Sequence, residues 1–169
     1  EFKGGANITD DDVSFAGATF ARSLDCTAGE FGYTDFTDAE IDGPATFTDV
    51  EFTDDTAFEA VEFGGQIVFD EVRFRENASF DAVSVDGTAS FRGAEFHGGA
   101  NVVDDDLSMV DATFDGDIDF HGARFRYVTL EDARVAGEAD FDETVFNRDA
   151  VFSGATFESA VTFEEARFR

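Results

Sequence analysis

Residues that crosslink, kink or anchor a chain are nearly absent from this sequence of 169 residues, which has one cysteine, one proline and no tryptophan. A single cysteine excludes an internal disulfide framework. No apolar run approaches the roughly 18 residues that a membrane-spanning helix needs, and no secretory leader is recognisable. We therefore predict a cytoplasmic protein that makes no membrane contact through this segment.

Lysine is also scarce: Lys3 stands alone beside ten arginines, whereas Asp and Glu number 39. The formal net charge of −28 disfavours direct binding to nucleic acid or to an anionic membrane, because both are negative. One explanation of the acidity is a halophilic surface that stays hydrated in molar salt, where charges are screened beyond about 3 Å. The other is an acidic rod that imitates the charge of duplex DNA towards a basic partner. We favour the halophilic explanation.

Constellations for catalysis or cofactor binding are missing too. The two histidines, His97 and His121, have no Cys or His at zinc-ligand spacing and no Ser or Cys placed for nucleophilic catalysis. Lys3 does not lie in a glycine-rich phosphate loop. We predict a protein that is not an enzyme and needs no cofactor.

Phenylalanine is abundant, and its 23 copies fall on one ladder with steps of mostly five or six residues, from Phe2 to Phe168. Other apolar residues complete the ladder to 31 positions, and these are Ile8, Cys26, Ile41, Val85, Val102, Met109, Leu130 and Val135. Two residues before each position a second column carries Ala, Val, Ile or Leu at 26 of 30 places. The exceptions are Gly29, Thr34, Thr56 and Thr144. Two apolar residues around one polar residue predict a very short strand with both apolar side chains on one face.

This spacing excludes helices, whose period is 3.6 residues, and long strands, because the alternation lasts for only one unit. A short fixed period is typical of a solenoid whose coils stack on one another. The stacked rings would then form one continuous core. Cys26 occupies a core position, so we interpret it as a small buried apolar residue and not as a reactive thiol.

The repeated unit of small, polar and large apolar residues resembles the pentapeptide-repeat family over essentially the whole chain. Matching segments are Ala18-Thr19-Phe20, Ala94-Glu95-Phe96, Ala123-Arg124-Phe125 and Ala155-Thr156-Phe157. The resemblance implies an all-β, right-handed, four-sided β-helix with one unit per side, forming a single domain over residues 1–169. The chain departs from the family in preferring Phe to Leu and in alternating steps of five and six, which predicts about eight coils of about 22 residues.

A longer repeat lies within the short one, because residues 1–75 are identical to residues 95–169 at 30 of 75 positions. This indicates a duplication of residues 1–94 in residues 95–169, with the second copy truncated. Each block holds seventeen ladder positions, which is not a multiple of four. Either the second copy is rotated by one face, or the count is wrong at the seven-residue steps that end at Phe15 and Met109.

These two long steps contain aspartate triplets, which are Asp10, Asp11 and Asp12 and then Asp104, Asp105 and Asp106. Clustered carboxylates can hold calcium or magnesium. However, neither EF-hand spacing nor a calcium-binding nonapeptide pattern is present. We favour solvated loops over a metal site.

Partner contacts are expected at the two tyrosines and at the chain end. Tyr33 and Tyr127 are 94 residues apart and follow core positions, so they are either exposed contact residues or close a corner of the coil, which is the simpler account. Neither end shows the polar cap that repeat proteins need, so we expect a longer protein or ends covered by partners, with self-association through Phe163 and Phe168. The arginines beside core positions are expected to pair with neighbouring carboxylates.

The predicted function is a non-enzymatic structural or protein-interaction rod. Some proteins of the family that this chain resembles occupy the DNA-binding saddle of gyrase. The alternative is therefore a DNA-mimicking modulator of gyrase or of another DNA-binding protein.

Overall fold

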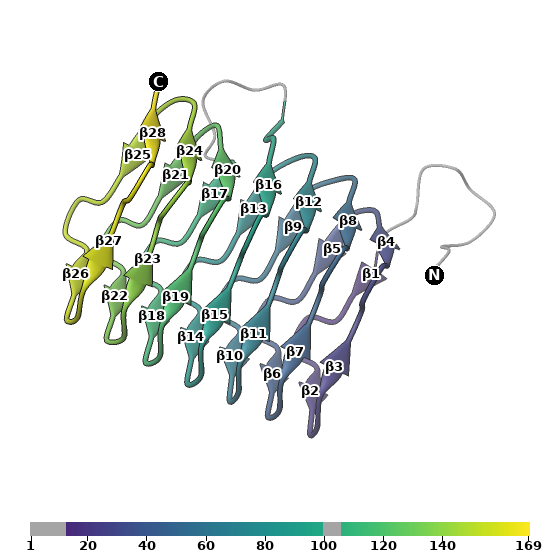
Figure 1. Ribbon diagram of the computed structural model, residues 1–169. Coiled ribbons are helices and arrows are strands. Elements are labelled where there is room, and N and C mark those ends of the chain that lie inside the picture. The colour runs from purple at the N-terminus through teal and green to yellow at the C-terminus, as the bar shows by residue number, and fades with distance from the viewer. Residues whose placement is uncertain (1–12, 100–105) are drawn as a thin grey trace.

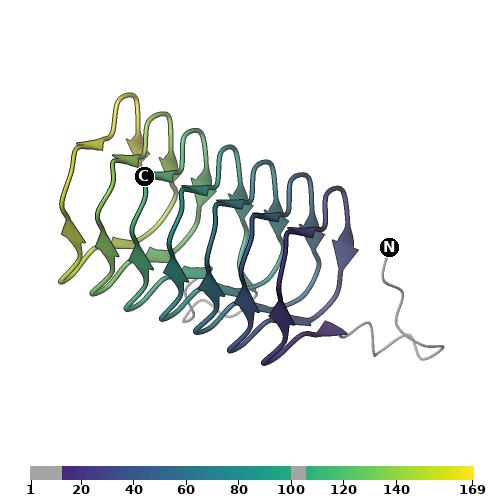
Figure 2. The ribbon, with the colours of Figure 1, turned by 90° about the horizontal axis from the view of Figure 1, so that it is seen from below.

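The computed structural model describes residues 13–99 and 106–169, and every regular element in these ranges is a strand of two residues (Figure 1). The strands form four parallel sheets of seven strands each. Successive strands along the chain belong to successive sheets, and the chain returns to the same sheet after every four strands. Seven coils result, and Figure 2 shows them as a stack of four-sided loops.

We number the sheets 1 to 4 in the order in which the chain enters them. Sheet 1 contains β1 (Val13–Ser14), β5 (Thr34–Asp35), β9 (Thr56–Ala57), β13 (Ala78–Ser79), β17 (Leu107–Ser108), β21 (Val128–Thr129) and β25 (Ala150–Val151). Sheet 2 contains β2 (Thr19–Phe20), β6 (Glu40–Ile41), β10 (Glu62–Phe63), β14 (Ser84–Val85), β18 (Thr113–Phe114), β22 (Arg134–Val135) and β26 (Thr156–Phe157). Sheet 3 contains β3 (Leu24–Asp25), β7 (Ala45–Thr46), β11 (Ile67–Val68), β15 (Ala89–Ser90), β19 (Ile118–Asp119), β23 (Ala139–Asp140) and β27 (Val161–Thr162). Sheet 4 contains β4 (Glu30–Phe31), β8 (Glu51–Phe52), β12 (Arg73–Phe74), β16 (Glu95–Phe96), β20 (Arg124–Phe125), β24 (Val145–Phe146) and β28 (Arg167–Phe168).

The predicted four-sided solenoid is confirmed, with seven coils in the described ranges where about eight were expected. Each of the 28 strands corresponds to one predicted ladder position. The other three predicted positions, Phe2, Ile8 and Val102, lie outside the described residues.

Two kinds of corner explain the alternating steps. After each strand of sheets 1 and 3 the chain makes a four-residue turn, as where the Ala39 N–H donates to the Phe36 carbonyl at 2.9 Å. The third residue of the turn has positive φ, for example Asp38 at 58°, which is the pattern of a type II turn. These corners always advance the ladder by five residues, whereas those from sheet 2 to sheet 3 always advance it by six.

The corner from sheet 4 to sheet 1 varies in length and resolves the question of rotation. Among the described strands, β16 on sheet 4 is followed by β17 on sheet 1. Four coils therefore separate Val13 from Leu107, and residues 94 apart lie on the same sheet. Rotation by one face is therefore excluded for residues 94 apart, because four coils of four sides separate them, which is one side fewer than the seventeen predicted positions.

The core consists of stacked phenylalanine rings. The rings of Phe47 and Phe69 are 4.6 Å apart and nearly parallel, and both side chains are fully buried. Burial of each ring stabilises the fold by about 1.5–3 kcal/mol, and together the rings offset the conformational entropy that is lost when such a narrow coil becomes ordered. Thr144 is also buried, and its hydroxyl donates to the Phe120 carbonyl at 2.8 Å. Polar residues in the second column are therefore accommodated by bonds to the backbone.

Candidate interaction surfaces

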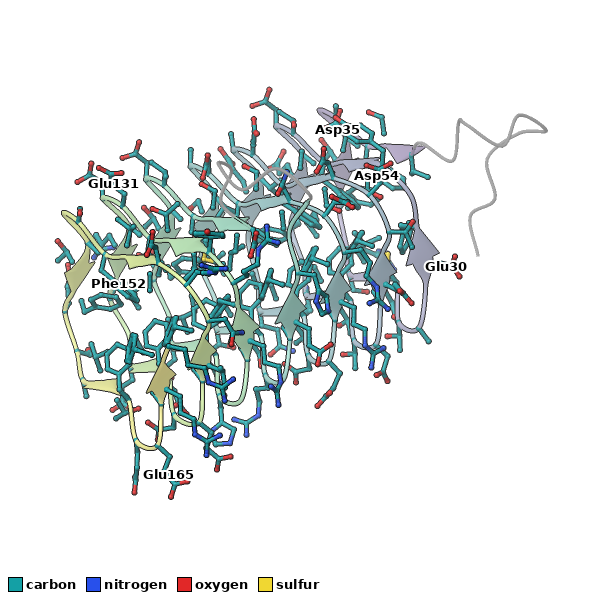
Figure 3. The ribbon with its side chains drawn as sticks, turned by 90° about the horizontal axis from the view of Figure 1, so that it is seen from above. Glu30, Asp35, Asp54, Glu131, Phe152 and Glu165 are labelled. Carbon is teal, nitrogen blue, oxygen red and sulfur yellow. The ribbon has the colours of Figure 1, made fainter. Side chains whose placement is uncertain are left out.

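Outward-facing side chains differ from sheet to sheet although the interior is continuous. In Figure 3 the labelled carboxylates Glu30, Glu131 and Glu165 lie on the outside of the coils, whereas Phe152 lies among the rings inside. In sheets 2 and 4 the first residue of each strand is the outward one. These residues decide which partner each face suits.

Sheet 2 carries an acidic surface, which we call the carboxylate quartet and define as Glu40, Asp42, Glu62 and Asp86. The four residues line a hollow of about 240 Å³ and come from three consecutive coils. Glu62 is in direct register with Glu40 on the neighbouring strand. Within the described residues none of the four has an ion pair, so their mutual repulsion is uncompensated. The hollow is suited to a basic group.

Asp106 is the only member of the aspartate triplets within the described ranges, and its side chain is buried. Its Oδ2 accepts a hydrogen bond of 2.8 Å from the Tyr127 N–H, and its Oδ1 lies 3.3 Å from Arg126 Nη2. Burial raises the pKa of Asp106, while these two partners act in the opposite direction. The expectation of a solvated loop is therefore wrong for Asp106, which anchors the chain after the long corner.

No metal site emerges from the part of the chain that the structure describes, where no three His, Cys, Asp or Glu side chains are grouped to hold an ion. The remaining weak candidates, Asp10, Asp11, Asp12, Asp104 and Asp105, lie outside the described residues. The histidines have different acidic neighbours, with His97 Nε2 at 3.4 Å from Glu95 and His121 Nε2 at 3.9 Å from Glu143.

The two tyrosines occupy equivalent places, each directly before a strand of sheet 1, but their surroundings differ. Tyr33 is 40% exposed and lines a hollow of about 290 Å³ together with Asp55 and Glu59. Tyr127 is half-buried, and the guanidinium of Arg126 lies 5.5 Å from its ring centroid. Only Tyr33 has the exposure that a contact residue needs.

The last described coil exposes part of the ladder. Phe163 and Phe168 are 41% and 62% exposed, although each still stacks on the coil below, on Phe141 at 4.8 Å and on Phe146 at 4.6 Å. Both predicted contact residues are therefore accessible here.

Cys26 lies at the opposite end of the described coils and is half-buried. Desolvation, reinforced by the charge of Asp25, raises the pKa of its thiol to about 11. The thiol is therefore protonated at neutral pH, which makes it a poor nucleophile.

Arginines gather on sheet 4, a feature that the sequence interpretation missed. The segment Arg-Phe-Arg occurs three times on this sheet, at residues 73–75, 124–126 and 167–169. Some of the expected ion pairs form, such as Arg75 Nε to Glu51 Oε1 at 2.6 Å. Arg167 and Arg169 have no ion pair among the described residues. The recurrence of this tripeptide was the available signal.

No helix in the described ranges is both long and apolar enough to cross a bilayer. This agrees with an architecture in which the regular elements are strands of two residues.

Comparisons with known proteins identify the family. The model of pentapeptide repeats (9 copies) matches residues 36–84, 58–104 and 102–145. No protein of curated function matches the chain significantly. Among solved structures, HetL, a pentapeptide repeat protein involved in heterocyst differentiation regulation from the cyanobacterium Nostoc, is 12% identical with a TM-score of 0.23, covering 85% of this chain and 86% of HetL. Trypsin-treated QnrB1, a plasmid-mediated fluoroquinolone resistance protein, is 11% identical with a TM-score of 0.25, covering 86% and 90%. Because the family model covers well over half of the sequence, this chain belongs to the pentapeptide-repeat family.

Proposed function

We propose that this chain is a non-enzymatic rod that binds a protein partner through the acidic surface of sheet 2. The observation that carries the proposal is the carboxylate quartet, in which four carboxylates share one hollow without a counter-charge from the described residues. Placing like charges together is costly for the fold, whereas a basic partner converts the same arrangement into binding energy. The net charge of −28 also keeps the rod hydrated in high salt, which makes a halophilic setting part of the proposal.

Rigidity of the backbone supports this role. Glu40 and Glu62 lie in register on paired strands about 4.8 Å apart, and Asp42 and Asp86 follow β6 and β14, which both pair with β10. A surface that is already ordered loses little conformational entropy when a partner binds. The rod therefore suits a partner whose basic groups repeat along a strand or a groove.

Affinity capture with matched variants tests the proposal. The quartet variant carries Glu40→Gln, Asp42→Asn, Glu62→Gln and Asp86→Asn. The control carries Glu59→Gln, Glu131→Gln, Asp149→Asn and Glu164→Gln, so both lose four charges. We expect the wild-type chain and the control to capture a partner that the quartet variant does not capture. This partner is then purified, and its affinity for all three proteins is measured by titration. Equal capture by all three proteins would contradict a role for sheet 2.

Self-association is a second part of the proposal, through the end that exposes Phe163 and Phe168. Two flat coils meeting at these rings would bury apolar surface in the way that successive coils do within the rod. Light scattering over a range of concentrations tests it, with Phe168→Asp as the comparison. A wild-type chain that stays monomeric throughout would remove this part and leave the sheet 2 proposal intact.

The duplication of residues 1–94 in residues 95–169 is likewise an interpretation. It is supported by identity at 30 of 75 positions and by the equivalent placing of residues 94 apart, as in β1 and β17 of sheet 1. A deletion variant that lacks one block, residues 14–107, is expected to keep the strands of all four sheets in register. Loss of its β circular dichroism would argue against equivalent blocks.

DNA mimicry is the alternative function, and linear charge density favours it. Seven coils stack to about 34 Å, and a duplex of that length carries about 20 phosphate charges. The net charge of the whole chain, −28, is of the same order. A gyrase supercoiling assay in high salt separates the two functions, because a mimic inhibits or protects gyrase and its quartet variant does not. No effect at any molar excess would exclude the alternative.

A further inference from the structure

The arginines of this acidic chain are concentrated on one side of the rod. Seven of the ten lie on sheet 4 or within three residues of its strands, and they are Arg73, Arg75, Arg124, Arg126, Arg148, Arg167 and Arg169. Sheet 2, which carries the carboxylate quartet, is two faces away and therefore opposite. The arginine surface lies outside the site proposed for a basic partner.

A hollow of about 310 Å³ opens within this surface, beside strands β16, β20 and β24. Its polar lining is provided by Glu95, His97, Arg124, Arg126, Asn147 and Arg148. Three guanidinium groups and one carboxylate thus face one space. Three other hollows on the described residues are lined by carboxylates and by no arginine.

Arg126 is held in position by the residues of the long corner. Its Nη2 donates to the Gly99 carbonyl at 2.9 Å and lies 3.3 Å from the buried Asp106 carboxylate. Its Nε is buried and has no hydrogen-bond partner among the described residues. A guanidinium that is held in place before a ligand arrives loses little conformational freedom when its exposed N–H groups bind an oxygen ligand.

The other cations of the hollow are only weakly neutralised. Arg148 has no ion pair within the described ranges. Glu95, the single carboxylate, is shared among Arg73 at 3.7 Å, Arg124 at 3.9 Å and His97 at 3.4 Å. These separations are too long for strong charge-assisted hydrogen bonds. The hollow therefore keeps a local positive charge.

We propose that this hollow binds the phosphate group of a small molecule. Its donors come from three successive coils, and a tetrahedral anion with several acceptor oxygens satisfies them better than one planar carboxylate. Its volume lies at the lower end of small-ligand sites. The group is supplied either by free inorganic phosphate or by a small phosphate ester, and both present the same oxygens to the arginines.

Isothermal titration with sodium phosphate, against sodium chloride of equal ionic strength, measures binding directly. A second titration uses a nucleoside monophosphate, and tighter binding of this ligand identifies an ester as the source, whereas equal or weaker binding identifies free phosphate. The wild-type chain is expected to bind phosphate specifically. Heats no larger than those of sodium chloride for both ligands would overturn the proposal.

Three variants locate the binding. Arg148→Gln removes a cation without an ion pair and should weaken binding about tenfold or more. Glu95→Gln removes the competing carboxylate and should tighten binding, which a purely structural role of Glu95 would not do. Arg22→Gln, another exposed arginine without an ion pair in the described residues, is the matched control and should bind as the wild type does. Unchanged affinity in both Arg148→Gln and Glu95→Gln would place the anion elsewhere and overturn the assignment.

Discussion

Sheets 2 and 4 have the same parallel backbone and lie on opposite sides of the rod, but they differ both inside and outside. Behind sheet 4 runs an unbroken column of seven phenylalanines, which are Phe31, Phe52, Phe74, Phe96, Phe125, Phe146 and Phe168. Behind sheet 2 the column alternates with smaller residues, namely Ile41, Val85 and Val135. Outside, sheet 4 carries the three Arg-Phe-Arg segments, whereas sheet 2 carries the carboxylate quartet. The coil therefore constrains the size and polarity of the inward side chain, whereas the outward positions are free to be specialised.

The largest loss of folding stability is expected when one phenylalanine is removed from the core column behind sheet 4 or sheet 2. Phe74 and Phe63 are each 1% exposed, but Phe74 stacks on Phe52 and Phe96 at 4.9 Å, whereas Phe63 has one distant ring neighbour, Phe58 at 6.5 Å. Phe74→Ala should cost about 3–5 kcal/mol, and Phe63→Ala less by about 0.5–1.5 kcal/mol. Guanidinium unfolding at fixed ionic strength measures both. Equal losses would show that ring stacking adds nothing to burial.

A smaller loss of folding stability is expected when Asp106, which bonds Arg126 and Tyr127, is replaced. Asp106→Ala leaves the Tyr127 N–H and Arg126 without their acceptor and should cost about 1–3 kcal/mol at neutral pH. Asp142→Ala, which removes another carboxylate that accepts a backbone N–H bond, from Glu164, but is more exposed, is a suitable comparison. A loss at Asp106 no larger than that at Asp142 would contradict the anchoring role.

The contribution of Asp106 to folding stability depends on pH in a defined direction. Because burial raises the pKa of Asp106 above its unfolded value, the folded state takes up the proton first as the pH falls. Relative to Asp106→Asn, the wild-type chain should therefore gain stability as the pH falls through the folded pKa towards about 3.9, and the difference should be constant above that window. Urea unfolding of both proteins between neutral pH and about pH 4 checks this. A wild-type chain that loses stability relative to the variant would reverse the assigned cause.

The smallest effect concerns the outward charges. Glu62→Arg places a cation in register with Glu40 and should stabilise the chain by about 0.5–1 kcal/mol in low salt, because it relieves like-charge repulsion. Arg73→Glu on sheet 4 joins Glu51 and Glu95 in one row and should destabilise by a similar amount. Thermal unfolding in low and in molar salt is the measurement. Effects that persist in molar salt would not be electrostatic, because exposed charges more than about 3 Å apart are screened there.

The interior of the fold could be predicted from the sequence because its determinants are local. The spacing of Phe47, Phe52 and Phe58 already indicates where each short strand lies, which side chains face the core and where the chain turns. The charge of each face could not be predicted in the same way. It depends on which ladder positions fall on the same sheet, and the sequence alone does not show at which corner the five-residue and six-residue steps lie. Arg73, Arg124 and Arg167 meet on one sheet only because the coils between them take 21, 22 or 29 residues. The burial of Asp106 likewise depends on tertiary contacts with Arg126 and Tyr127, which are distant in sequence.

The variable corner between sheets 4 and 1 has a consequence for how such a rod can be modified. The ladder positions on the described strands of sheets 4 and 1 are separated by five, six or thirteen residues, while the steps between the other described strands have a constant length at each edge. Extra segments inserted at the edge between sheets 4 and 1 lengthen a coil without shifting any strand to another sheet. We therefore expect this edge to accept inserted loops or tags while the strands of all four sheets keep their register.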